Sequence, residues 1–318
     1  MSRVVVLAGG LSHERDVSLQ SGRRVTEALR GVGAEVTMLD ADESLAESLR
    51  EEPPDCVVPL LHGETGEGGA LQELLEFSGV TYVGSGPGAA RLAFDKPTAK
   101  HVVAASGVRT PTSVALAADT FRQAGAGTVI AVVLEQLGLP LMVKPARGGS
   151  ALGCSIVTAA EELPGAMVSC FAYGEVALIE QFVSGLELSV PVFAADDGPS
   201  AYPAVEIRPD GGVYDYTARY TAGATEFVVP AQIDDTAAAA CADAAVAAHR
   251  ALGLRDLSRC DLIIDDEGVV WFLEVNVAPG MTETSLVPLS VEAAGRDVGT
   301  VFAGLVDRAV GRDRAWTG

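Results

Sequence analysis

Short apolar runs alternate with amphipathic stretches along the first 95 residues of the chain. The runs have the length of buried strands, and the stretches between them carry apolar residues at helical spacing and end at glycine. The predicted strands cover residues 3–7, 35–40, 55–62 and 80–86, and the predicted helices cover residues 19–33 and 71–79. Because strands and helices alternate, this region is predicted to form an α/β unit around a parallel sheet.

Two glycine-rich loops follow strands of this unit, at residues 9–18 and 62–69. Ligands of parallel sheets bind beyond the C-terminal ends of the strands, which is where both loops are expected. Neither loop matches a dinucleotide-binding motif or a P-loop. Each loop taken alone is best explained as an ordinary glycine-rich turn, so a ligand site here needs support from other parts of the chain.

A second unit begins at Lys96, within a predicted helix over residues 95–107. Further along, two predicted strands, 141–144 and 154–157, enclose the glycine-rich sequence ARGGSALG. A Rossmann fold or a P-loop would place a helix after such a loop, whereas a strand follows here. A loop between two antiparallel strands can cover phosphate groups with its backbone N–H groups, and Lys144 at the end of the first strand can reach a phosphate.

The third unit begins near residue 185 and contains a predicted β-hairpin. It also contains a polar loop at 211–227 and an alanine-rich helix that starts at Asp234 or Asp235 and ends at Gly253. The stretch SRCDLIIDDEGVVWFLEVN then places two apolar runs on either side of the turn DDEG. This pattern is typical of a hairpin.

Three oxygen-bearing side chains converge in the predicted hairpin. Successive side chains of a strand point to opposite faces, so Glu274 and Asn276 share a face, and pairing back from the turn places Asp261 within a residue or two of Glu274. Carboxylate and amide oxygens are ligands that Mg²⁺ prefers, with waters or phosphates at the remaining positions. Arg259 projects from the same face and suits an anionic substrate or a developing oxyanion. The alternative is that the strand simply ends in solvent.

Composition and charge exclude several classes of partner. The 318 residues carry 22 basic and 43 acidic side chains, and the net charge of −21 argues against nucleic acid and anionic membranes but not against a small anionic ligand. The five cysteines form no C-x-x-C pair, which favours reduced thiols in the cytoplasm over disulfides or a zinc site. The N-terminus is predicted to be a strand rather than a signal peptide, and no apolar run has the length of a membrane span. A cytoplasmic protein is therefore expected.

Nine motifs span nearly the whole chain in the order and spacing of one enzyme family. They are GGLSHERDVSL, LHGETGEGGALQ, GSG, DK at 95–96, VKPARGGSALG, LIEQFVSGLE, YDYTARY, RCDLII and LEVNVAPGMTETSLVP. With these motifs the chain resembles the D-alanine–D-alanine ligases of the ATP-grasp superfamily. The resemblance implies an α/β ATP-grasp fold with a Rossmann-like, parallel-sheet substrate domain (1–95). Two α+β domains, a central one (96–184) and a C-terminal one (185–318), are then expected to enclose the ATP cleft.

The resemblance also implies roles for individual residues. Those expected to bind ATP are Lys96, Lys144, Gly149, Ser150, Glu180, Gln181, Phe182, Val183, Glu187 and Arg219. Those expected to hold two Mg²⁺ ions, or Mn²⁺ in their place, are Asp261, Glu274 and Asn276. Those expected in catalysis are Glu14, Ser150, Tyr220, Arg259, Gly280 and Ser285, and those expected to bind the amino acid are Ser18, His62, Ser285 and Leu286.

The reaction implied by the resemblance is the ATP-dependent joining of two D-alanines for peptidoglycan precursor synthesis. The carboxylate of one D-alanine attacks the γ-phosphate of ATP, and the amine of the second attacks the resulting acyl phosphate. Closure of the 211–227 loop is expected to keep water from this intermediate. D-alanine and ATP are thus the expected partners, and the resemblance also suggests a homodimer.

The sequence departs from the family pattern at three positions, which leaves the acceptor open. Arg219 stands in place of the usual lysine, Gly68 in place of an acidic residue, and Ala151 in place of a frequent serine. One alternative is therefore a ligase of the same scaffold that joins other amino or hydroxy acids, of the D-alanine–D-lactate type or in a natural-product pathway. Another is a nucleotide-binding regulatory protein without catalysis, against which the intact Arg259 and Glu274 argue.

Overall fold

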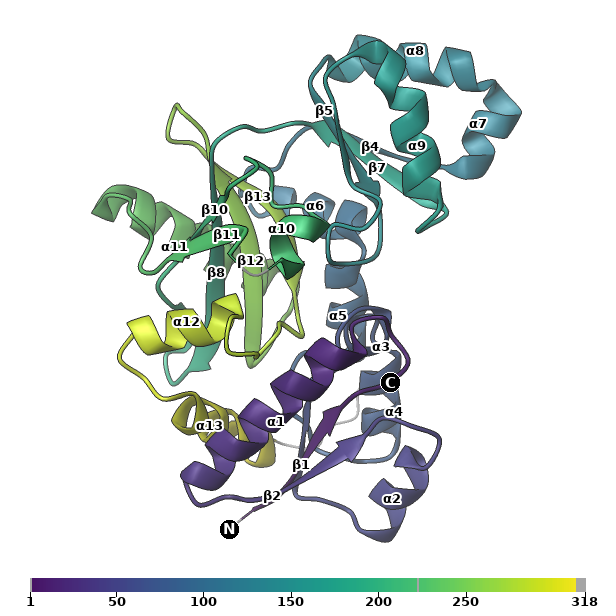
Figure 1. Cartoon of the computed structure of the whole chain (residues 1–318). Coiled ribbons are helices and arrows are strands. Elements are labelled where there is room, and N and C mark those ends of the chain that lie inside the picture. Colours follow the sequence, from purple (N-terminus) through teal and green to yellow (C-terminus); the bar gives the residue numbers. More distant parts are fainter. Residues whose placement is uncertain (1, 222, 313–318) are drawn as a thin grey trace.

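The computed structural model describes residues 2–221 and 223–312, with only the backbone of Tyr220 described. Three β-sheets form the framework of this part of the chain (Figure 1). A three-stranded parallel sheet lies in the lower part of the figure, a six-stranded sheet in the middle and a four-stranded sheet at the top. The predicted order of one parallel-sheet unit followed by two α+β units is confirmed.

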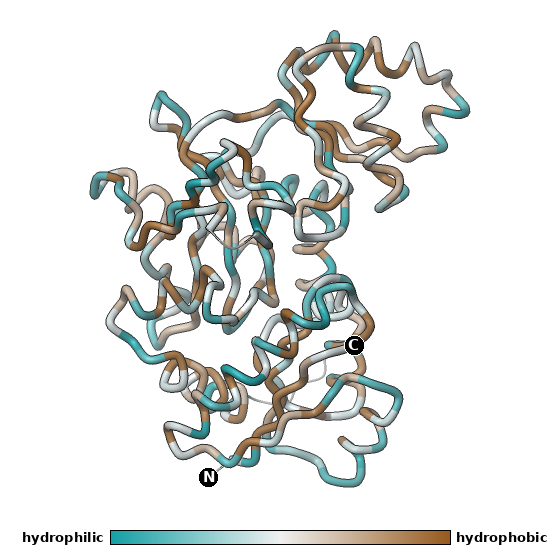
Figure 2. The backbone as a smooth tube through the Cα atoms, in the orientation of Figure 1, coloured by the Kyte–Doolittle hydropathy of each residue, from teal (hydrophilic) through white to brown (hydrophobic). Residues whose placement is uncertain are grey.

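The parallel sheet forms as the hydrophobic pattern predicts. Its central strand β1 (Arg3–Ala8) pairs in parallel with β2 (Glu35–Asp40) on one side and β3 (Cys56–Pro59) on the other. Figure 2 shows apolar residues along this part of the backbone. Helix α1 (Arg15–Gly31) packs against β1 and β2, and it starts earlier than the predicted residue 19.

The prediction of a strand over residues 80–86 is wrong. One residue of it, Tyr82, pairs with Val57 in an isolated parallel bridge. Two residues later Gly84 takes a φ of +119°, which ends the extended run, and Pro87 then begins helix α5 (Pro87–Phe94). The segment is a buried connection between two helices rather than a strand of the sheet.

Three short helices complete the N-terminal unit: α2 (Leu45–Glu51), α3 (Glu64–Glu67) and α4 (Ala70–Phe77). Helix α3 lies inside the predicted loop at 62–69. This loop follows β3 and the 9–18 loop follows β1, so both leave the same edge of the sheet. They lie in contact, since a Cβ on Gly63 would sit 2.9 Å from Oε2 of Glu14.

The four-stranded sheet has the order β4 (Ser113–Ala117), β7 (Val176–Gln181), β5 (Leu141–Pro145) and β6 (Ser155–Val157), with antiparallel neighbours throughout. Its helices are α7 (Ala118–Ala124), α8 (Ala126–Leu137), the 3-10 turn η1 (Ala160–Glu162) and α9 (Leu163–Phe171). The glycine-rich sequence ARGGSALG therefore joins two antiparallel strands, as predicted.

The six-stranded sheet has the order β11 (Thr225–Val228), β10 (Val205–Pro209), β8 (Leu186–Ala195), β12 (Leu257–Ile264) and β13 (Val270–Asn276), and β9 (Gly198–Ala201) pairs with β8. The loop before β11 contains a short helix, α10 (Tyr216–Tyr220). Helix α11 (Asp235–Ala251) begins as predicted, because the side chain of Asp234 accepts a hydrogen bond from Ala237 N at 2.8 Å.

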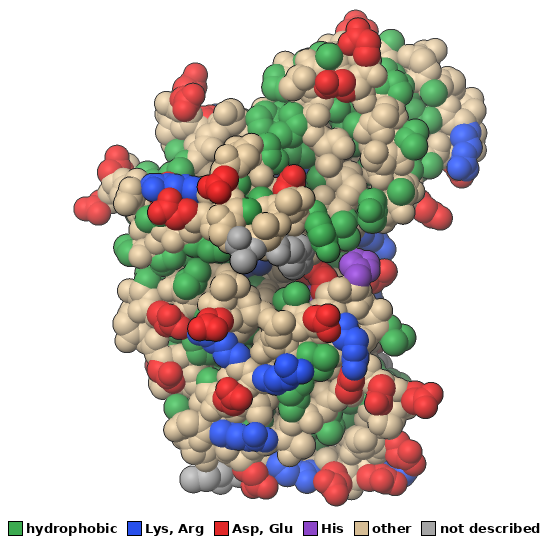
Figure 3. Space-filling model, in the orientation of Figure 1, with side chains coloured by type: hydrophobic (Ala, Val, Ile, Leu, Met, Phe, Trp, Pro, Cys, Tyr) green, Lys and Arg blue, Asp and Glu red, His purple; other side chains and the backbone are tan. Residues whose placement is uncertain are grey.

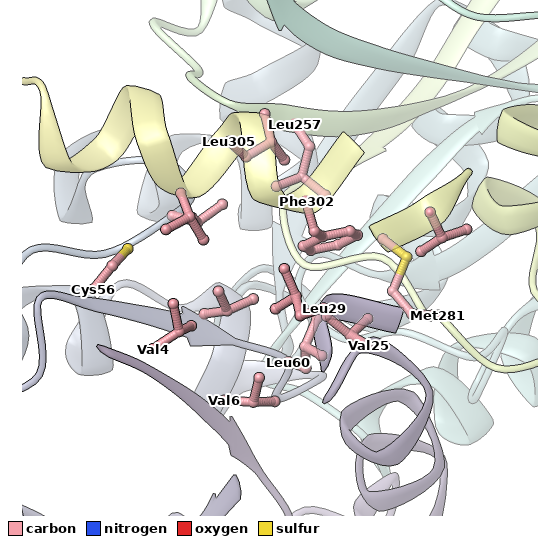
Figure 4. Packing of buried hydrophobic residues seen from close by; sticks show 14 of the residues in the cluster. Val4, Val6, Val25, Leu29, Cys56, Leu60, Leu257, Met281, Phe302 and Leu305 are labelled. Carbon is pink, nitrogen blue, oxygen red and sulfur yellow. The ribbon is translucent and has the colours of Figure 1, made fainter. Parts of the chain in front are cut away.

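Packing of the helices does not follow chain order. Helix α6 (Lys96–Ala105) belongs to the predicted central domain, yet Ala99 and Val103 share an apolar cluster with β8, β12, β13 and α11. After α12 (Leu286–Ala293), the last helix α13 (Val298–Val310) returns to the N-terminal unit. Figure 4 shows Phe302 of α13 lying among residues of α1 and the parallel sheet. The division at 96 and 185 therefore stays a proposal.

Charged side chains are spread over the face of the molecule that Figure 3 shows. On the face shown in Figure 3, acidic groups are scattered, and arginines lie among them in the lower half. Among the helices of residues 2–221 and 223–312, none combines the length and apolar character that a bilayer crossing needs. On this face acidic and basic groups are interspersed, and in a chain with a net charge of −21 the binding of a small anionic ligand depends on local cations.

Candidate active site

Two cavities meet between the sheets. The first, of ≈ 230 Å³, lies between the four-stranded sheet and the β12–β13 hairpin. The second, of ≈ 720 Å³, lies between the loops of the N-terminal unit, helix α10 and the start of α12. The residues that line both cavities are Lys96, Gly148, Gly149, Tyr214, Arg219 and Glu274. A ligand in one cavity therefore shares a wall of cations and backbone with a ligand in the other.

The structure brings nearly all the expected ATP-binding residues to the first cavity. Those that line it are Lys96, Lys144, Gly149, Glu180, Gln181, Phe182, Val183, Glu187 and Arg219, while Ser150 lines the second cavity. Burial raises the pKa of Glu187 to about 7, although Arg219 opposes this change. The carboxyl group of Glu187 is therefore held in a poorly solvated place that favours a hydrogen-bonding ligand.

A buried ion triad crosses the cleft behind this cavity. Glu180 on β7 lies 2.7 Å from Lys144 Nζ on β5 and 2.8 Å from Lys100 Nζ on α6. Burial favours a neutral Glu180, but the two ammonium groups outweigh it and lower its pKa. Burial lowers the pKa of Lys100 to about 8 despite the attraction of Glu180. The triad thus ties α6, which packs on the six-stranded sheet, to the four-stranded sheet.

Sequence reasoning missed Lys100, although a signal was present. Lys100 follows Lys96 by four residues on one helix, which places both on the same face. The chain has only three lysines, and the third is Lys144. All three are buried around this cleft, at 8 %, 3 % and 7 % exposure for Lys96, Lys100 and Lys144. All the lysines of the chain therefore lie at this cleft, and the exposed basic side chains are arginines.

The glycine-rich loop ARGGSALG contacts the N-terminal unit through a hydrogen bond from Ser150. Ser150 and Ala151 both have a φ of 56°, a left-handed conformation that side chains rarely adopt. Ser150 Oγ donates to Glu14 Oε1 at 2.5 Å, and Lys96 Nζ donates to Gly148 O at 2.6 Å. The loop backbone is thereby held open toward the two cavities, and its successive N–H groups suit an anion.

The β12–β13 hairpin forms with the predicted convergence of side chains. Asp261 pairs directly with Glu274, Arg259 pairs with Asn276, and a register shift follows Asp261. The guanidinium of Arg259 donates to both oxygens of Asp261 at 2.9 Å. Burial opposes ionisation of Glu274, but Lys96 and other nearby cations lower its pKa to about 2.

The donor set of the hairpin fits a hard divalent cation. In the part of the chain that the structure describes, no group of three or more His, Cys, Asp or Glu side chains is placed so that these side chains alone could hold a metal ion. The hairpin offers two carboxylates, Asp261 and Glu274, and the amide oxygen of Asn276, which accepts from Ala278 N at 2.7 Å and retains a second lone pair. Oxygen ligands of this kind, few in number, suit Mg²⁺ that completes its shell with phosphate and water.

The second cavity gathers the residues expected to act on the amino acid. Those that line it are Glu14, His62, Ser150, Arg259, Gly280, Ser285 and Leu286. Ser285 Oγ accepts from Thr282 N at 2.9 Å, and it lies so close to Gly280 that a Cβ there would approach it to 2.9 Å. A side chain at position 280 would therefore have to displace this hydroxyl. The side chain of Tyr220 lies outside the described residues, and Arg219 next to it stacks 4.2 Å above the ring of Tyr214.

Ser18 and Glu67 are placed differently from what the sequence predicted for this cavity. Ser18 is fully buried behind the wall, where its hydroxyl accepts from Gly9 N at 2.8 Å and donates to Leu60 O at 2.7 Å. It supports the loops rather than facing the cavity. Glu67, which sequence reasoning missed, lines the cavity, and burial with the nearby charge of Glu14 raises its pKa to about 8.

These features together define a class of enzyme. A cleft between two antiparallel sheets, a glycine-rich loop over it and an acidic hairpin opposite are the arrangement of an ATP-grasp ligase.

Comparison with known proteins gives the family within this class. The family model for the C-terminal part of D-ala D-ala ligases matches residues 102–308. The D-alanine–D-alanine ligase of Gloeobacter violaceus is 42 % identical over 310 residues, covering 97 % of this chain and 99 % of the relative. That of Syntrophotalea carbinolica is 40 % identical over 306 residues, covering 96 % and 94 %. The chain belongs to the D-alanine–D-alanine ligase family.

Solved structures agree with this membership. The crystal structure of the D-alanine–D-alanine ligase of Bacillus anthracis has a TM-score of 0.83 and 27 % identity, with both chains covered in full (100 %). The VanG D-Ala:D-Ser ligase of Enterococcus faecalis has a TM-score of 0.82 at 27 % identity, with 97 % of this chain and 99 % of that chain covered. The family and the ATP-grasp fold implied by the sequence motifs are both confirmed.

Proposed function

We propose that this chain joins two D-alanine molecules into D-alanyl-D-alanine, with cleavage of ATP to ADP and phosphate, for peptidoglycan precursor synthesis. The observation that carries the proposal is the shared wall of the two cavities, where Lys96, Arg219 and Glu274 face both. A ligase must pass a phosphoryl group from a nucleotide site to a carboxylate site, and this wall is where the two sites adjoin.

At the nucleotide end, the adenine lies against Glu180 to Val183 and the ribose hydroxyls against Glu187. Lys96, Lys144 and the backbone amides around Gly149 hold the phosphates, and Arg219 reaches the same phosphates from the 211–227 loop. The support for these roles is that each residue lines the first cavity, and that the three lysines and Arg219 bring positive charge to a strongly acidic chain.

Asp261, Glu274 and Asn276 hold two Mg²⁺ ions in this proposal, and Mn²⁺ is able to replace them. When bound, the ions neutralise charge on the phosphates of ATP. Glu274 is suited to this role because nearby cations lower its pKa to about 2, which keeps it ionised at neutral pH. The Arg259 guanidinium, fixed by two hydrogen bonds to Asp261, then remains aimed at the second cavity.

At the amino-acid end, Glu14 binds the ammonium group of the first D-alanine, near His62. A carboxylate oxygen of this first D-alanine attacks the γ-phosphorus of ATP. The bond between the γ-phosphorus and ADP breaks, and an acyl phosphate forms. The second D-alanine, bound near Ser285 and Leu286, loses a proton from its ammonium group to water, and the free amine attacks the carbonyl carbon. Arg259 and the Gly280 amide stabilise the oxyanion, and phosphate leaves with the transferred oxygen.

The 211–227 loop acts as a lid over this intermediate, with Tyr214 and Arg219 facing both cavities. The family motifs imply for Ser150 and Tyr220 the role of bridging the loops, and the proposal keeps it. The three domains of the proposal are 1–95, 96–184 and 185–318, and the chain works as a homodimer. Sedimentation equilibrium tests the homodimer directly, since a monomer at micromolar concentration contradicts it.

Phosphate release tests the function. The purified protein is given ATP and Mg²⁺ with D-alanine, D-serine, D-lactate or no acceptor, and products are identified by mass spectrometry. We expect phosphate release that depends on D-alanine, with one dipeptide formed per phosphate. Equal release without an amino acid, or faster ligation of another substrate, contradicts the proposal.

A further inference from the structure

The segment from Ala278 to Met281, which is part of the connection between β13 and α12, is held at both ends by buried side chains of the N-terminal unit. Met281 N donates to Ser21 Oγ at 3.0 Å, and Ala278 O lies 2.8 Å from His62 Nδ1. Ser21 Oγ lies 3.3 Å from His62 Nε2, which closes the chain of hydrogen bonds. Gly280 lies between the two anchored positions.

The three hydrogen bonds together require a proton on Nδ1 of His62. A backbone carbonyl only accepts, so Nδ1 of His62 must carry a proton to bind Ala278 O. The N–H of Met281 only donates, so Ser21 Oγ accepts it, and the hydroxyl meets Nε2 of His62 either with its own proton or with its second lone pair. The geometry thus fits an imidazolium or a neutral form, and in the neutral form the proton sits on Nδ1, the less common site in free histidine.

The surroundings of His62 favour this neutral form. Ser21 is fully buried and His62 is 5 % exposed. Burial lowers the pKa of His62, and Arg259 acts in the same direction while Glu14 opposes it. The chain of hydrogen bonds thus stands on geometry, and the environment is consistent with it.

Helix α1 relates this anchor to the amino-acid site. Glu14 precedes the helix and Ser21 lies seven residues further on, which corresponds to about 10 Å along the axis. The side chain of Met281 packs in the same apolar cluster as Val25 of α1 (Figure 4). One rigid helix therefore sets the distance between the carboxylate of Glu14 and the backbone at Gly280.

We propose that Ser21 and His62 are positioning residues that aim the Gly280 amide at the reacting carbonyl. We call the hydrogen bonds among Ser21, His62, Ala278 and Met281 the clamp. The role of the Gly280 amide as an oxyanion donor rests on the proposed function, whereas the existence of the clamp does not. Neither side chain needs to touch the reacting atoms, because each acts through a backbone group that flanks Gly280. The clamp also explains a buried histidine in a cavity wall without assigning it an acid–base step.

Nitrogen NMR of the histidines tests the clamp independently of activity. The full-length protein has four histidines, and the spectrum of His62→Gln identifies the signals of His62 by their loss. At pH 7.5 we expect a neutral ring protonated on Nδ1. A ring that carries no proton on Nδ1 overturns the proposal, because Nδ1 could then not donate to Ala278 O.

Steady-state kinetics tests the consequence for catalysis. Ser21→Ala leaves the Met281 N–H without its acceptor, and we expect kcat to fall roughly ten- to a hundredfold with KM for ATP within about twofold. Ser258→Ala is the matched control, since Ser258 is also buried and bonds a buried histidine, His249, at 2.7 Å, away from both cavities. We expect its kcat to stay within about twofold of wild type.

Each outcome has a stated meaning. Equal losses of kcat in Ser21→Ala and Ser258→Ala, or a selective loss of ATP affinity in Ser21→Ala, overturn the positioning role. If Ser21→Ala does not fold, the protonation state of His62 in the wild-type protein decides the proposal. If the wild-type protein does not ligate D-alanine, the proposed function fails, and the NMR result still decides whether the clamp exists.

Discussion

Replacing Lys100 with methionine should make the protein more stable at neutral pH while weakening its use of ATP. Burial lowers the pKa of Lys100 from 10.5 to about 8, net of its attraction to Glu180. One pKa unit corresponds to about 1.4 kcal/mol, so holding the charged ammonium in the folded protein costs about 3 kcal/mol. Methionine is of similar length and uncharged, and it removes this cost.

The sign of the pH dependence follows from the lowered pKa. Between about pH 8 and pH 10.5 the folded protein has released the proton of Lys100 and the unfolded chain still binds it, so the stability of the wild type rises with pH. The variant has no such group. The advantage of Lys100→Met should therefore be largest below pH 8 and shrink by about 2 kcal/mol between pH 7 and pH 9.5.

The effect on ATP is opposite, because Glu180 keeps only Lys144 as an ammonium partner. With less support for its charge and position, the carboxylate holds the nucleotide less well, and we expect KM for ATP to rise about tenfold while kcat for D-alanine ligation changes little.

Urea midpoints at the two pH values and lysine NMR are the assays. With three lysines in the chain, each ε-group gives a resolved signal, and Lys96 and Lys144 serve as internal references. A loss of stability at pH 7 together with three lysines that all titrate above pH 10 would refute the reasoning.

Three further predictions concern the lid, the oxyanion site and the acceptor. Arg219→Lys should retain most of the ligation rate and Arg219→Ala should lose roughly a hundredfold in kcat, since the charge faces both cavities; similar rates in the two variants would show that the charge does not matter. Gly280→Ala should lower kcat by at least about tenfold with a loss of only about 1 kcal/mol in stability. The reason is that the added Cβ displaces the hydroxyl of Ser285, whose hydrogen bond from Thr282 N is then lost. Kinetics and urea unfolding of the variant check this, and an unchanged kcat contradicts it. With equal D-alanine and D-lactate between pH 7 and 9, D-alanyl-D-alanine should dominate by mass spectrometry, because the loop TARYTAGATEF has no histidine to favour an anionic acceptor; a dominant depsipeptide contradicts the assignment.

Local patterns predicted most elements that carry the site. The hairpin at 258–276 formed with Asp261 opposite Glu274, because two apolar runs on either side of an acidic turn restrict the pairing to within a residue or two. The cap at Asp234 formed for the same local reason. The segment at 80–86 failed because its apolar residues suggest a strand, whereas the outcome depends on the backbone conformation at Gly84 and on the helix that starts at Pro87.

Long-range packing explains what the sequence did not reveal. The return of α13 to the N-terminal sheet and the seat of α6 on the six-stranded sheet depend on apolar faces that suit more than one partner. Glu67 and Ser21 belong to the site only through neighbours far away in the chain, such as Glu14 and Met281. Ser18 shows the reverse, since a motif residue proved to be a loop support once its two hydrogen bonds were visible.

Transfer of oxygen from D-alanine to phosphate tests the central claim most directly. The wild-type protein is given ATP, Mg²⁺ and D-alanine labelled with ¹⁸O in the carboxylate, and the released phosphate is analysed by mass spectrometry. If the carboxylate attacks the γ-phosphorus and the amine then displaces phosphate at the carbonyl, each phosphate carries one ¹⁸O atom. Unlabelled phosphate formed together with dipeptide would contradict the acyl phosphate route and the roles assigned to the wall between the two cavities.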